Sequence, residues 1–332
     1  MEKPRVAVVG ATGLVGQSFL SILEERKFPA ESFTLFSSAK SAGKTVKFFG
    51  KDYIVKELTK ESFKEEHFDI ALFSAGAAAS SVYAPIAAEN GCVVIDNSSY
   101  WRMDSTVPLV VPEVNPQDIK LNKGIIANPN CSTIQAVVVL KPLHDKYKIK
   151  RIVYSTYQSV SGGGQGAWED LENGVKGLPP KKLPFPIFAN CIPQIDVFTD
   201  TGYTKEEIKM VEETRKILGD QSLKITATTV RVPVFSAHSE AINVEFEKAF
   251  GLDGLVAAIA AQDGVRVVND VTDKENPYPM AINAAGKDEV FVGRIRRDFS
   301  VESGVNLWVV ADNVRKGAAL NAVQIAELLI SK

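Results

Sequence analysis

The chain has 332 residues, of which 45% are hydrophobic and 23% are charged, a balance typical of soluble globular proteins. Its formal net charge of -2 gives no electrostatic reason to expect nucleic-acid binding, although a local pocket can still be basic. We expect two domains, because one domain typically spans ~150 residues.

The sequence predicts a cytoplasmic protein without a secretory signal or a membrane segment. No stretch approaches the ~20 continuous apolar residues that are needed to span a bilayer. Three cysteines, Cys92, Cys131 and Cys191, lie far apart and are odd in number, so we expect free thiols in a reducing compartment. We predict no metal site.

The first 130 residues alternate predicted strands with predicted helices. An apolar run at 5–9 predicts a buried strand, followed by a glycine loop at 10–16 and a helix over 17–26. Further elements are strands at 33–36, 69–73, 92–95 and 124–127 and a helix over 77–90. This alternation implies βαβ units and a parallel sheet. We therefore predict an α/β, Rossmann-like domain over residues 1–130.

Residues 131–312 are predicted to form an α+β domain. After a helix over 132–146, long strands are expected at 150–160, 224–232, 241–247, 290–299 and 304–311. Ile242, Val244 and Phe246 recur with a period of two, which indicates a sheet with two different faces. A helix over 205–218 would cover this sheet, and 177–193 is expected to be an irregular surface segment. The last helix, over 314–331, is predicted to pack back on the first domain, so residues 313–332 are assigned there.

Gly10, Gly13 and Gly16 lie between a predicted strand and a predicted helix. Glycines let a pyrophosphate approach the backbone, and the helix N-terminus adds a partial positive charge. A tight turn without a ligand is the alternative. Residues 36–44 carry hydroxyls and lysines but no acid, which favours a 2′-phosphate and therefore NADP over NAD. A solvated Ser/Lys loop is the alternative there.

Cys131 is the strongest candidate for a nucleophile. It lies between Pro129, which ends a strand, and an apolar helix expected to begin at Ser132 or Thr133. A helix N-terminus favours the thiolate, which is the reactive form. The alternative is a small buried hydrophobe, the usual fate of a cysteine and the one that suits Cys92.

His238 is the best candidate for the base among three histidines. His67 lies in a charged segment and His144 at the charged end of a helix, so both are expected at the surface. His238 lies on a loop of small residues at the entry to a long strand. A surface-loop histidine without a catalytic role is the alternative.

These residues belong to a wider set of matches, and the sequence resembles the aspartate-semialdehyde dehydrogenase family over essentially its whole length. The matching segments are 10–16, 128–133, 158–162, 192–196, 206–210, 231–234 with His238, and 292–296. The resemblance implies an N-terminal NADP-binding domain and a C-terminal catalytic and dimerisation domain like that of glyceraldehyde-3-phosphate dehydrogenase. It also implies a homodimer through the second domain, with a tetramer left open.

The resemblance implies roles for individual residues. Cys131 would be the acyl-thioester nucleophile, His238 the acid/base and Gln158 the residue that orients the substrate. Arg231 would bind the substrate carboxylate, whose two oxygens a planar guanidinium can hold together. Phosphate-binding positions are matched by Arg102, Asn130 and Lys209, and a contact to the substrate amine by Glu206. Cofactor contacts are expected at Gly10, Thr12, Gly13, Leu14, Val15, Ser37, Lys40, Ser41, Ser161, Gly162 and Asn313.

Two positions depart from the family's pattern. Lys40 stands where arginine is often found, which could weaken binding of a 2′-phosphate. Gly163 stands where alanine is common, which loosens the backbone.

The reaction that the resemblance implies is the phosphorylating oxidation of L-aspartate 4-semialdehyde to 4-phospho-L-aspartate with NADP. In cells the reductive direction is expected, leading to lysine (through diaminopimelate), methionine, threonine and isoleucine.

Three other functions remain open at this point. An N-acetyl-gamma-glutamyl-phosphate reductase normally has Gly before and Tyr after its cysteine, whereas Asn130 and Ser132 flank Cys131. The second is a non-catalytic relative that binds NADP. The presence together of Cys131, His238, Gln158 and Arg231 argues against it. A glyceraldehyde-3-phosphate dehydrogenase shares the thioester chemistry but not the flanking motifs.

Overall fold

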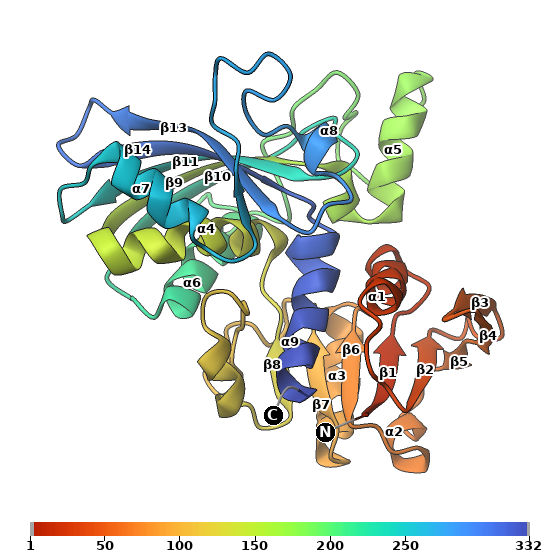
Figure 1. Ribbon diagram of the computed structural model, residues 1–332. Helices are drawn as coiled ribbons and strands as arrows, with labels where there is room; N and C mark the ends of the chain where they lie inside the picture. The colour runs from red at the N-terminus through yellow and green to blue at the C-terminus, as the bar shows by residue number, and fades with distance from the viewer. Residues whose placement is uncertain (1–2, 331–332) are drawn as a thin grey trace. The chain divides into compact units, whose positions relative to one another are not determined.

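The computed structural model describes residues 3–330, which divide into two compact units (Figure 1). The first unit comprises the residues up to Asn130 together with those from Ala318 onward, and the second comprises Cys131–Gly317. The last helix therefore belongs to the first unit, while residues 313–317, which the sequence assigned with it, belong to the second. Ser331, expected to end that helix, lies outside the described residues.

The first unit is built on a six-stranded parallel sheet with the strand order β5-β2-β1-β6-β7-β8. Its strands are β1 (Arg5–Val9), β2 (Ser32–Ser37), β5 (Lys56–Glu57), β6 (Ile70–Phe73), β7 (Val93–Asp96) and β8 (Ile125–Ala127). The central strands are apolar along their length because helices cover both faces of a doubly wound sheet. The chain order reverses between β1 and β6, which is where such sheets bind ligands.

Helices α1 (Leu14–Glu25) and α9 (Leu320–Ile330) pack against each other, and α3 (Ala77–Glu89) packs on β7 and β8. A short helix α2 (Ser62–Glu65), a 3-10 turn η1 (Pro116–Leu121) and a hairpin of β3 (Thr45–Phe48) and β4 (Lys51–Ile54) complete the unit. Apolar residues of α1 and α9, such as Phe19 and Val323, share one buried core. Helix α9 thus completes the first unit, although nearly 200 residues separate it in sequence from Asn130, where the rest of that unit ends.

The second unit is built on a mixed six-stranded sheet with the order β10-β9-β11-β14-β13-β12. Its strands are β9 (Ile149–Gln158), β10 (Lys224–Arg231), β11 (His238–Phe246), β12 (Val265–Val267), β13 (Val290–Asp298) and β14 (Gly304–Ala311). Pairs β9–β10 and β12–β13 are parallel, and the pairs between β9, β11, β14 and β13 are antiparallel.

Helices cover one face of this sheet. Helix α4 (Cys131–Tyr147) packs on β9, β11, β13 and β14 and against α6 (Lys205–Leu218) and α7 (Leu252–Ala260). Tyr154 on the covered face is fully buried, and its hydroxyl forms a hydrogen bond of 3.1 Å with Thr214 of α6. Further elements are η2 (Val160–Gly163), α5 (Gln165–Val175), α8 (Ala281–Ala284) and the π-helical turn η3 (Arg315–Ala319), whose last two residues belong to the first unit.

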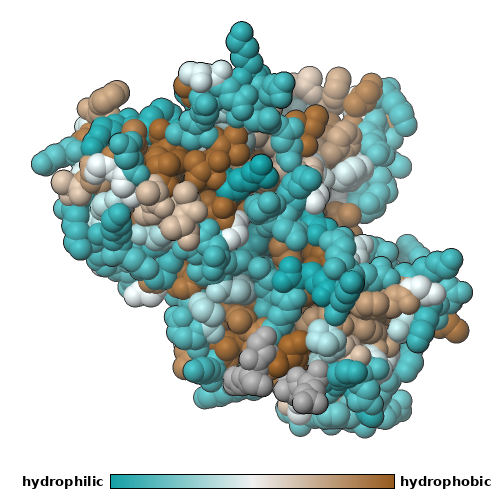
Figure 2. Space-filling model, in the orientation of Figure 1, coloured by the Kyte–Doolittle hydropathy of each residue, from teal (hydrophilic) through white to brown (hydrophobic). Residues whose placement is uncertain are grey.

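The opposite face of the second sheet carries aromatic and apolar side chains that are partly exposed. Tyr157 and Trp308 are in ring contact there, with centroids 5.4 Å apart. Met280, Leu307 and Trp308 help to line a shallow, mainly apolar groove on this unit. Figure 2 shows apolar side chains gathered on the second unit over the region of β11, β13 and β14. An apolar surface of this kind commonly marks a protein contact.

Most element bounds agree with the sequence predictions to within a few residues, and the exceptions have physical causes. Helix α1 begins at Leu14 rather than at 17, because its N-cap, Gly13, supplies no side-chain signal for the start. Helix α9 was expected from Val314, but a π-helical turn precedes it. Helix α5 was not predicted, since Gly166 and Gly174 disfavour a helix.

Candidate active site

A groove of about 480 Å³ lies at the carboxyl ends of β1, β2 and β6 in the first unit. Gly10 forms part of its wall with a φ of 83°, and a Cβ added there would lie 2.2 Å from the Ser74 carbonyl oxygen. A side chain at this position is therefore excluded, and the backbone itself lines the groove. Bare backbone at the start of a helix suits a phosphate group.

The groove collects some of the predicted cofactor residues but not all. Its lining includes Gly10, Thr12, Gly13, Ser37 and Ser41. The hydroxyls of Thr12 and Ser37 lie 2.9 Å apart. Leu14, Val15 and Lys40 are not among the lining residues, and Lys40 is exposed.

Glu57 also lines this groove, and the sequence analysis missed it. The acid was sought in the segment that follows β2, whereas Glu57 arrives from the short strand β5, where it pairs with Ser37. Glu57 reaches the groove because β5 pairs with β2, and no pattern in the sequence indicates this pairing.

Cys131 is the first residue of α4 and is half-buried. The helix therefore begins at the cysteine itself, one residue earlier than expected. Cys92 is buried, as predicted for a small hydrophobe, and burial raises the pKa of its thiol. Cys191 is exposed. Only Cys131 combines access to solvent with a helix N-terminus.

His238 is the first residue of β11 and is fully buried, so a solvated surface-loop histidine is excluded. The backbone N–H of Ser159 donates to its Nδ1 at 3.0 Å. Since Nδ1 accepts this hydrogen bond, the neutral ring carries its proton on Nε2. Burial and the nearby charge of Arg231 hold the pKa of His238 well below its usual value, so the ring is neutral at physiological pH.

The Nε2 atom of His238 is buried and has no hydrogen-bond partner among the described residues. A buried N–H donor without a partner is costly, and such atoms commonly mark places where a ligand binds.

The prediction for His144 was wrong. It was expected at the surface but is buried on α4, and its Nδ1 accepts from the backbone N–H of Ile149 at 3.3 Å. His67 has an exposed side chain, as predicted.

Arg231 ends β10 and lies beside His238. Its Nη1 donates to the Ser159 carbonyl oxygen at 2.6 Å. A Cβ added to Gly162 would lie 3.0 Å from Arg231 Nη1 and 3.1 Å from His238 Nε2, so both side chains meet at this glycine. Burial lowers the pKa of Arg231, whereas Glu206 and an ionised Cys131 raise it. The guanidinium is therefore close enough to Cys131 to attract a thiolate.

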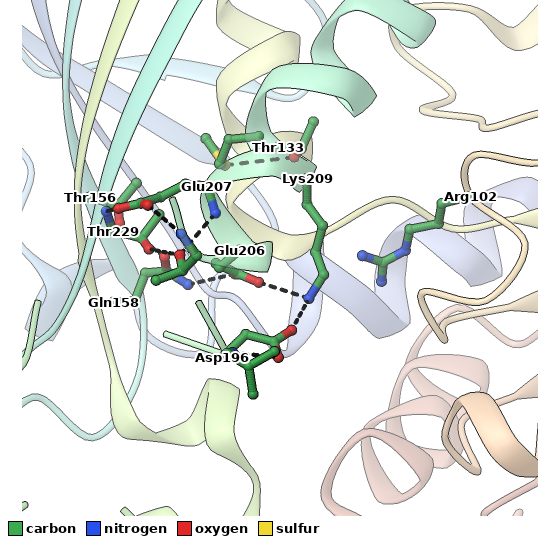
Figure 3. Close-up of polar contacts among 12 residues, drawn as sticks. Arg102, Thr133, Thr156, Gln158, Asp196, Glu206, Glu207, Lys209 and Thr229 are labelled. Carbon is green, nitrogen blue, oxygen red and sulfur yellow. Dashed lines mark hydrogen bonds and ion pairs between the residues drawn. The ribbon is translucent and has the colours of Figure 1, made fainter. Parts of the chain in front are cut away.

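A buried polar chain connects β9 with α6 (Figure 3). Thr156 Oγ1 donates to Gln158 Oε1 at 2.9 Å, and Gln158 Nε2 donates to Glu206 Oε1 at 3.1 Å. Lys209 Nζ then joins Glu206 Oε2 at 3.2 Å and Asp196 Oδ2 at 2.8 Å. Burial lowers the pKa of Lys209, but Glu206 and Asp196 outweigh this effect, so that the pKa is raised and the ammonium stays charged.

Three residues predicted to contact the cofactor lie in the second unit beside His238. Asn313 Oδ1 accepts hydrogen bonds from Ser161 Oγ at 3.1 Å and from the backbone N–H of Ala237 at 3.1 Å. It also accepts from Ser159 Oγ at 3.0 Å. Ser161, Gly162 and Asn313 thus surround the histidine within this unit.

Arg102 and Asn130 are buried residues of the first unit. Arg102 Nε donates to the Asn128 carbonyl oxygen at 2.9 Å, and its Nη2 donates to that of Asn97 at 2.9 Å. These bonds hold the guanidinium in place. Lys209, the other predicted phosphate ligand, belongs to the second unit.

Several residues of the site escaped the sequence analysis. Ser159 holds both His238 and Arg231 through its backbone, and a serine gives no sign of such a role. Asp196 pairs with Lys209 across 13 positions of sequence. Glu240 could have been found, because it follows His238 by two residues in a strand and so shares its buried face.

Two features are absent from residues 3–330. No helix there is long and apolar enough to cross a membrane. No group of three or more His, Cys, Asp or Glu side chains in the same part of the chain could hold a metal ion.

Comparison with known families gives two matches that together span most of the chain. Residues 5–122 match the NAD binding domain of semialdehyde dehydrogenases, and residues 140–316 match the dimerisation domain of semialdehyde dehydrogenases.

Individual proteins match over nearly the whole length. The chain is 56% identical to an aspartate-semialdehyde dehydrogenase of Aquifex aeolicus, over 99% of this chain and 98% of the relative. A crystal structure of aspartate semialdehyde dehydrogenase II from Vibrio cholerae, complexed with ASA, is 49% identical with a TM-score of 0.94 and covers 99% of both chains. An aspartate semialdehyde dehydrogenase with NADP from Candida albicans is 26% identical with a TM-score of 0.77 and covers 98% of both.

Proposed function

This chain belongs to the aspartate-semialdehyde dehydrogenase family and is an oxidoreductase that acts on an aldehyde group, and we propose that it works through a thioester on Cys131. The proposed reaction is the phosphorylating oxidation of L-aspartate 4-semialdehyde to 4-phospho-L-aspartate with NADP. In cells the reductive direction supplies the biosynthesis of the amino acids derived from aspartate. The observation that carries the proposal is the buried, unpartnered Nε2 of His238 beside Arg231, in the same unit as a half-buried cysteine at a helix N-terminus.

NADP fits the groove of the first unit. The bare backbone at Gly10 leaves room for the pyrophosphate, and the hydroxyls of Ser37 and Ser41 in the groove suit a 2′-phosphate. Lys40, exposed beside Ser41 in the sequence, is assigned as a further contact to that phosphate. When bound, the cofactor accepts a hydride from the substrate carbon. We assign residues 1–130 and the C-terminal helix to cofactor binding, and residues 131–312 to catalysis and dimerisation. Ser161, Gly162 and Asn313 are assigned as further cofactor contacts.

The first half of the reaction forms the thioester. The Cys131 thiolate attacks the aldehyde carbon, and the carbonyl oxygen becomes an oxyanion. His238 Nε2–H donates a hydrogen bond to this oxygen, which also satisfies the unpartnered N–H. Loss of a hydride from the same carbon then restores the carbonyl group and leaves the acyl group bonded to sulfur.

Substrate binding uses the charges of the same unit. Arg231 binds the substrate carboxylate, Glu206 binds the substrate amine, and Gln158, which is hydrogen-bonded to Glu206, orients the chain between them. Opposite charges at the two ends of an amino acid set its direction in the site.

The second half of the reaction releases the product. Inorganic phosphate attacks the thioester carbon, the thiolate leaves, and the acyl phosphate forms. We assign Lys209, Arg102 and Asn130 to phosphate binding. Lys209 supports this assignment because its ammonium is held charged by two carboxylates, one of which belongs to a substrate-binding residue.

The second unit matches a dimerisation domain, and we propose that the protein is a cytoplasmic homodimer that associates through this unit. The partly exposed pair of Tyr157 and Trp308 on the uncovered sheet face supports the assignment. A tetramer would require a second contact surface.

The test is phosphate-dependent reduction of NADP by L-aspartate semialdehyde, in the wild type and two variants. Arg231→Ala is expected to lower kcat/KM for the semialdehyde by roughly two to three decades, because a bidentate contact is lost, with a smaller effect on the KM of phosphate. Lys209→Ala is expected to raise mainly the KM of phosphate. Steady-state rates with each substrate varied in turn give both parameters.

Lys205→Ala is the matched control, since it removes a lysine from the same helix. Equal effects of the two variants on both substrates would contradict the division of roles. Activity with N-acetyl-glutamyl semialdehyde in place of the aspartyl compound, or a clear preference for NAD, would contradict the proposed substrate or cofactor.

A further inference from the structure

Glu240 is a fully buried carboxyl group that the reaction proposed above leaves unused. It lies on β11, whose neighbours are β9 and β14, and pairs there with Thr156 and Val309. Its side chain is 0% exposed, and neither carboxyl oxygen has a hydrogen-bond partner of normal geometry among the described residues. Leaving a buried carboxyl group without a partner is costly, so a purely structural position would favour an apolar residue.

The surroundings of Glu240 connect it to the candidate active site. Side chains two apart in a strand point to the same face, so Glu240 shares the helix-covered face with His238. Helix α4 packs on β11, and the hydroxyl of Ser132, the residue after Cys131, lies near enough to Glu240 to favour its charged form. Gln135, one turn further along α4, donates from Nε2 to the His238 carbonyl oxygen at 3.4 Å.

The side-chain oxygen of Gln135 is an unsatisfied acceptor, because this buried Oε1 has no hydrogen-bond partner among the described residues. The first two turns of α4 therefore present one hydroxyl and one amide oxygen on the helix face that packs on β11. A carboxylic acid can donate through its O–H and accept through its carbonyl oxygen, which matches such a pair.

We propose that Glu240 is a positioning residue for the thioester reaction, one that joins the first two turns of α4 to β11 through Ser132 and Gln135 and so holds Cys131 in register with His238. This inference rests on the proposed function, because it presumes that Cys131 and His238 act together.

The protonated carboxyl group is the form that suits this role. Burial and the negative charge of Glu206 raise the pKa of Glu240 well above its usual value, against the smaller opposing effect of the Ser132 hydroxyl. Three further titratable groups on this face are His238, Arg231 and the Tyr154 phenol, and burial raises the pKa of that phenol. An uncharged Glu240 also adds no negative charge to the helix terminus that favours the Cys131 thiolate.

Two substitutions test whether the role of Glu240 needs a charge and whether it needs the hydrogen-bonding groups. Glu240→Gln keeps the shape, the donor and the acceptor, so kcat is expected to stay within about three-fold of the wild type. Glu240→Leu keeps the volume but removes both hydrogen-bonding groups. Its kcat is expected to fall at least about ten-fold with little change in KM, because small displacements of reacting groups are costly.

Two further readouts do not involve the substrate. The rate of Cys131 alkylation by iodoacetamide, followed against pH, is expected to keep its midpoint in Glu240→Gln and to shift it to higher pH in Glu240→Leu. The melting temperature of Glu240→Gln relative to the wild type is expected to rise as pH increases from 5 to 8. The sign follows because the native wild type retains a proton that the unfolded chain releases above pH ~4.3, and the glutamine variant lacks this linkage.

Glu245→Gln is the matched control, since Glu245 lies on the same strand and pairs with Lys150 at 2.8 Å on the partly exposed face. It should leave kcat and the alkylation midpoint unchanged. A ten-fold loss of kcat in Glu240→Gln would overturn the proposal by showing that the charge is required. Unchanged kcat and alkylation in Glu240→Leu would overturn it by showing that no positioning is needed.

Failure of the proposed function would look different. The wild type would then show no phosphate-dependent reduction of NADP by L-aspartate semialdehyde, whatever the Glu240 variants do. If Glu240→Leu does not fold, the glutamine variant alone decides, because loss of its activity or of its stability at pH 8 contradicts the inference.

Discussion

At the scale of single residues, the chemistry of the candidate site is set by neighbours rather than by residue type. The sequence identified Cys131, His238 and Arg231 as candidates, but it left open whether His238 is a surface-loop residue, whereas the residue is fully buried. The proton position on its ring follows from one backbone N–H of Ser159, some 80 residues earlier in the chain. Such a contact depends on the pairing of β9 with β11, which no local sequence pattern reports.

The neutral state of His238 predicts a specific effect of pH on stability. Because its pKa is lowered in the folded protein, the unfolded chain binds a proton below pH ~6.5 that the native protein does not. Stability therefore falls on acidification, by at most ~1.4 kcal/mol per pH unit for this one group. His238→Asn is expected to show a smaller loss of unfolding free energy between pH 7 and pH 5, measured by urea denaturation.

His67→Asn serves as the comparison for that experiment, because the His67 side chain is exposed. It should lose stability with acid as the wild type does. If His238→Asn also follows the wild-type curve, His238 is not held neutral in the folded protein.

At the scale of elements, the bounds of helices and strands were predicted well where the sequence has a strong periodic pattern. They were predicted poorly where it has none. The bounds of β1, α6 and β14 agree with the sequence predictions, since each has clear periodicity or a clear stop. The bounds that failed lie at glycine-rich or π-helical turns, where no side chain marks the boundary. The polar chain from Gln158 to Lys209 depends on α6, because this helix carries Glu206 and Lys209.

Helix α6 begins with a complete capping box. Thr204 Oγ1 accepts from the Glu207 backbone N–H at 3.3 Å, and the Glu207 carboxylate accepts from the backbone N–H groups of Thr204 at 2.7 Å and Thr229 at 3.0 Å. Glu207 therefore ties the helix that carries Glu206 and Lys209 to strand β10. The sequence did not indicate these hydrogen bonds of Glu207, which it showed only as part of the segment 206–210 that matches the family.

Removing the cap tests the role of this helix start. Thr204→Ala is expected to lower the free energy of unfolding by ~1 kcal/mol, the usual loss for an N-cap. It should also raise the KM of phosphate more than that of the semialdehyde, because the cap positions the first turn with Lys209. Thr204→Ser keeps the capping oxygen and should behave nearly as the wild type. An alanine variant as stable as the serine variant would contradict the assignment.

At the scale of the whole molecule, the sequence predicted the two-part organisation but not the inner structure of each part. The alternation of strands and helices up to residue 130 predicted the parallel sheet, and the long strands beyond it predicted a different second unit. The order of the second sheet could not be predicted, because its strands pair over long sequence distances and in both senses. The long separation between α1 and α9 likewise has no local signal, and only the apolar face of α9 suggested that it packs elsewhere.

The central claim is that the acyl group is carried on Cys131. The direct measurement mixes the enzyme with NADP and L-aspartate semialdehyde without phosphate, follows NADPH, and determines the intact mass. The wild type should form about one NADPH per chain and an acyl adduct that disappears when phosphate is added, as expected of a thioester. Cys92→Ala and Cys191→Ala should do the same, whereas Cys131→Ala should form no adduct and still bind NADPH. An adduct that persists in Cys131→Ala, or continued turnover by that variant, would contradict the account.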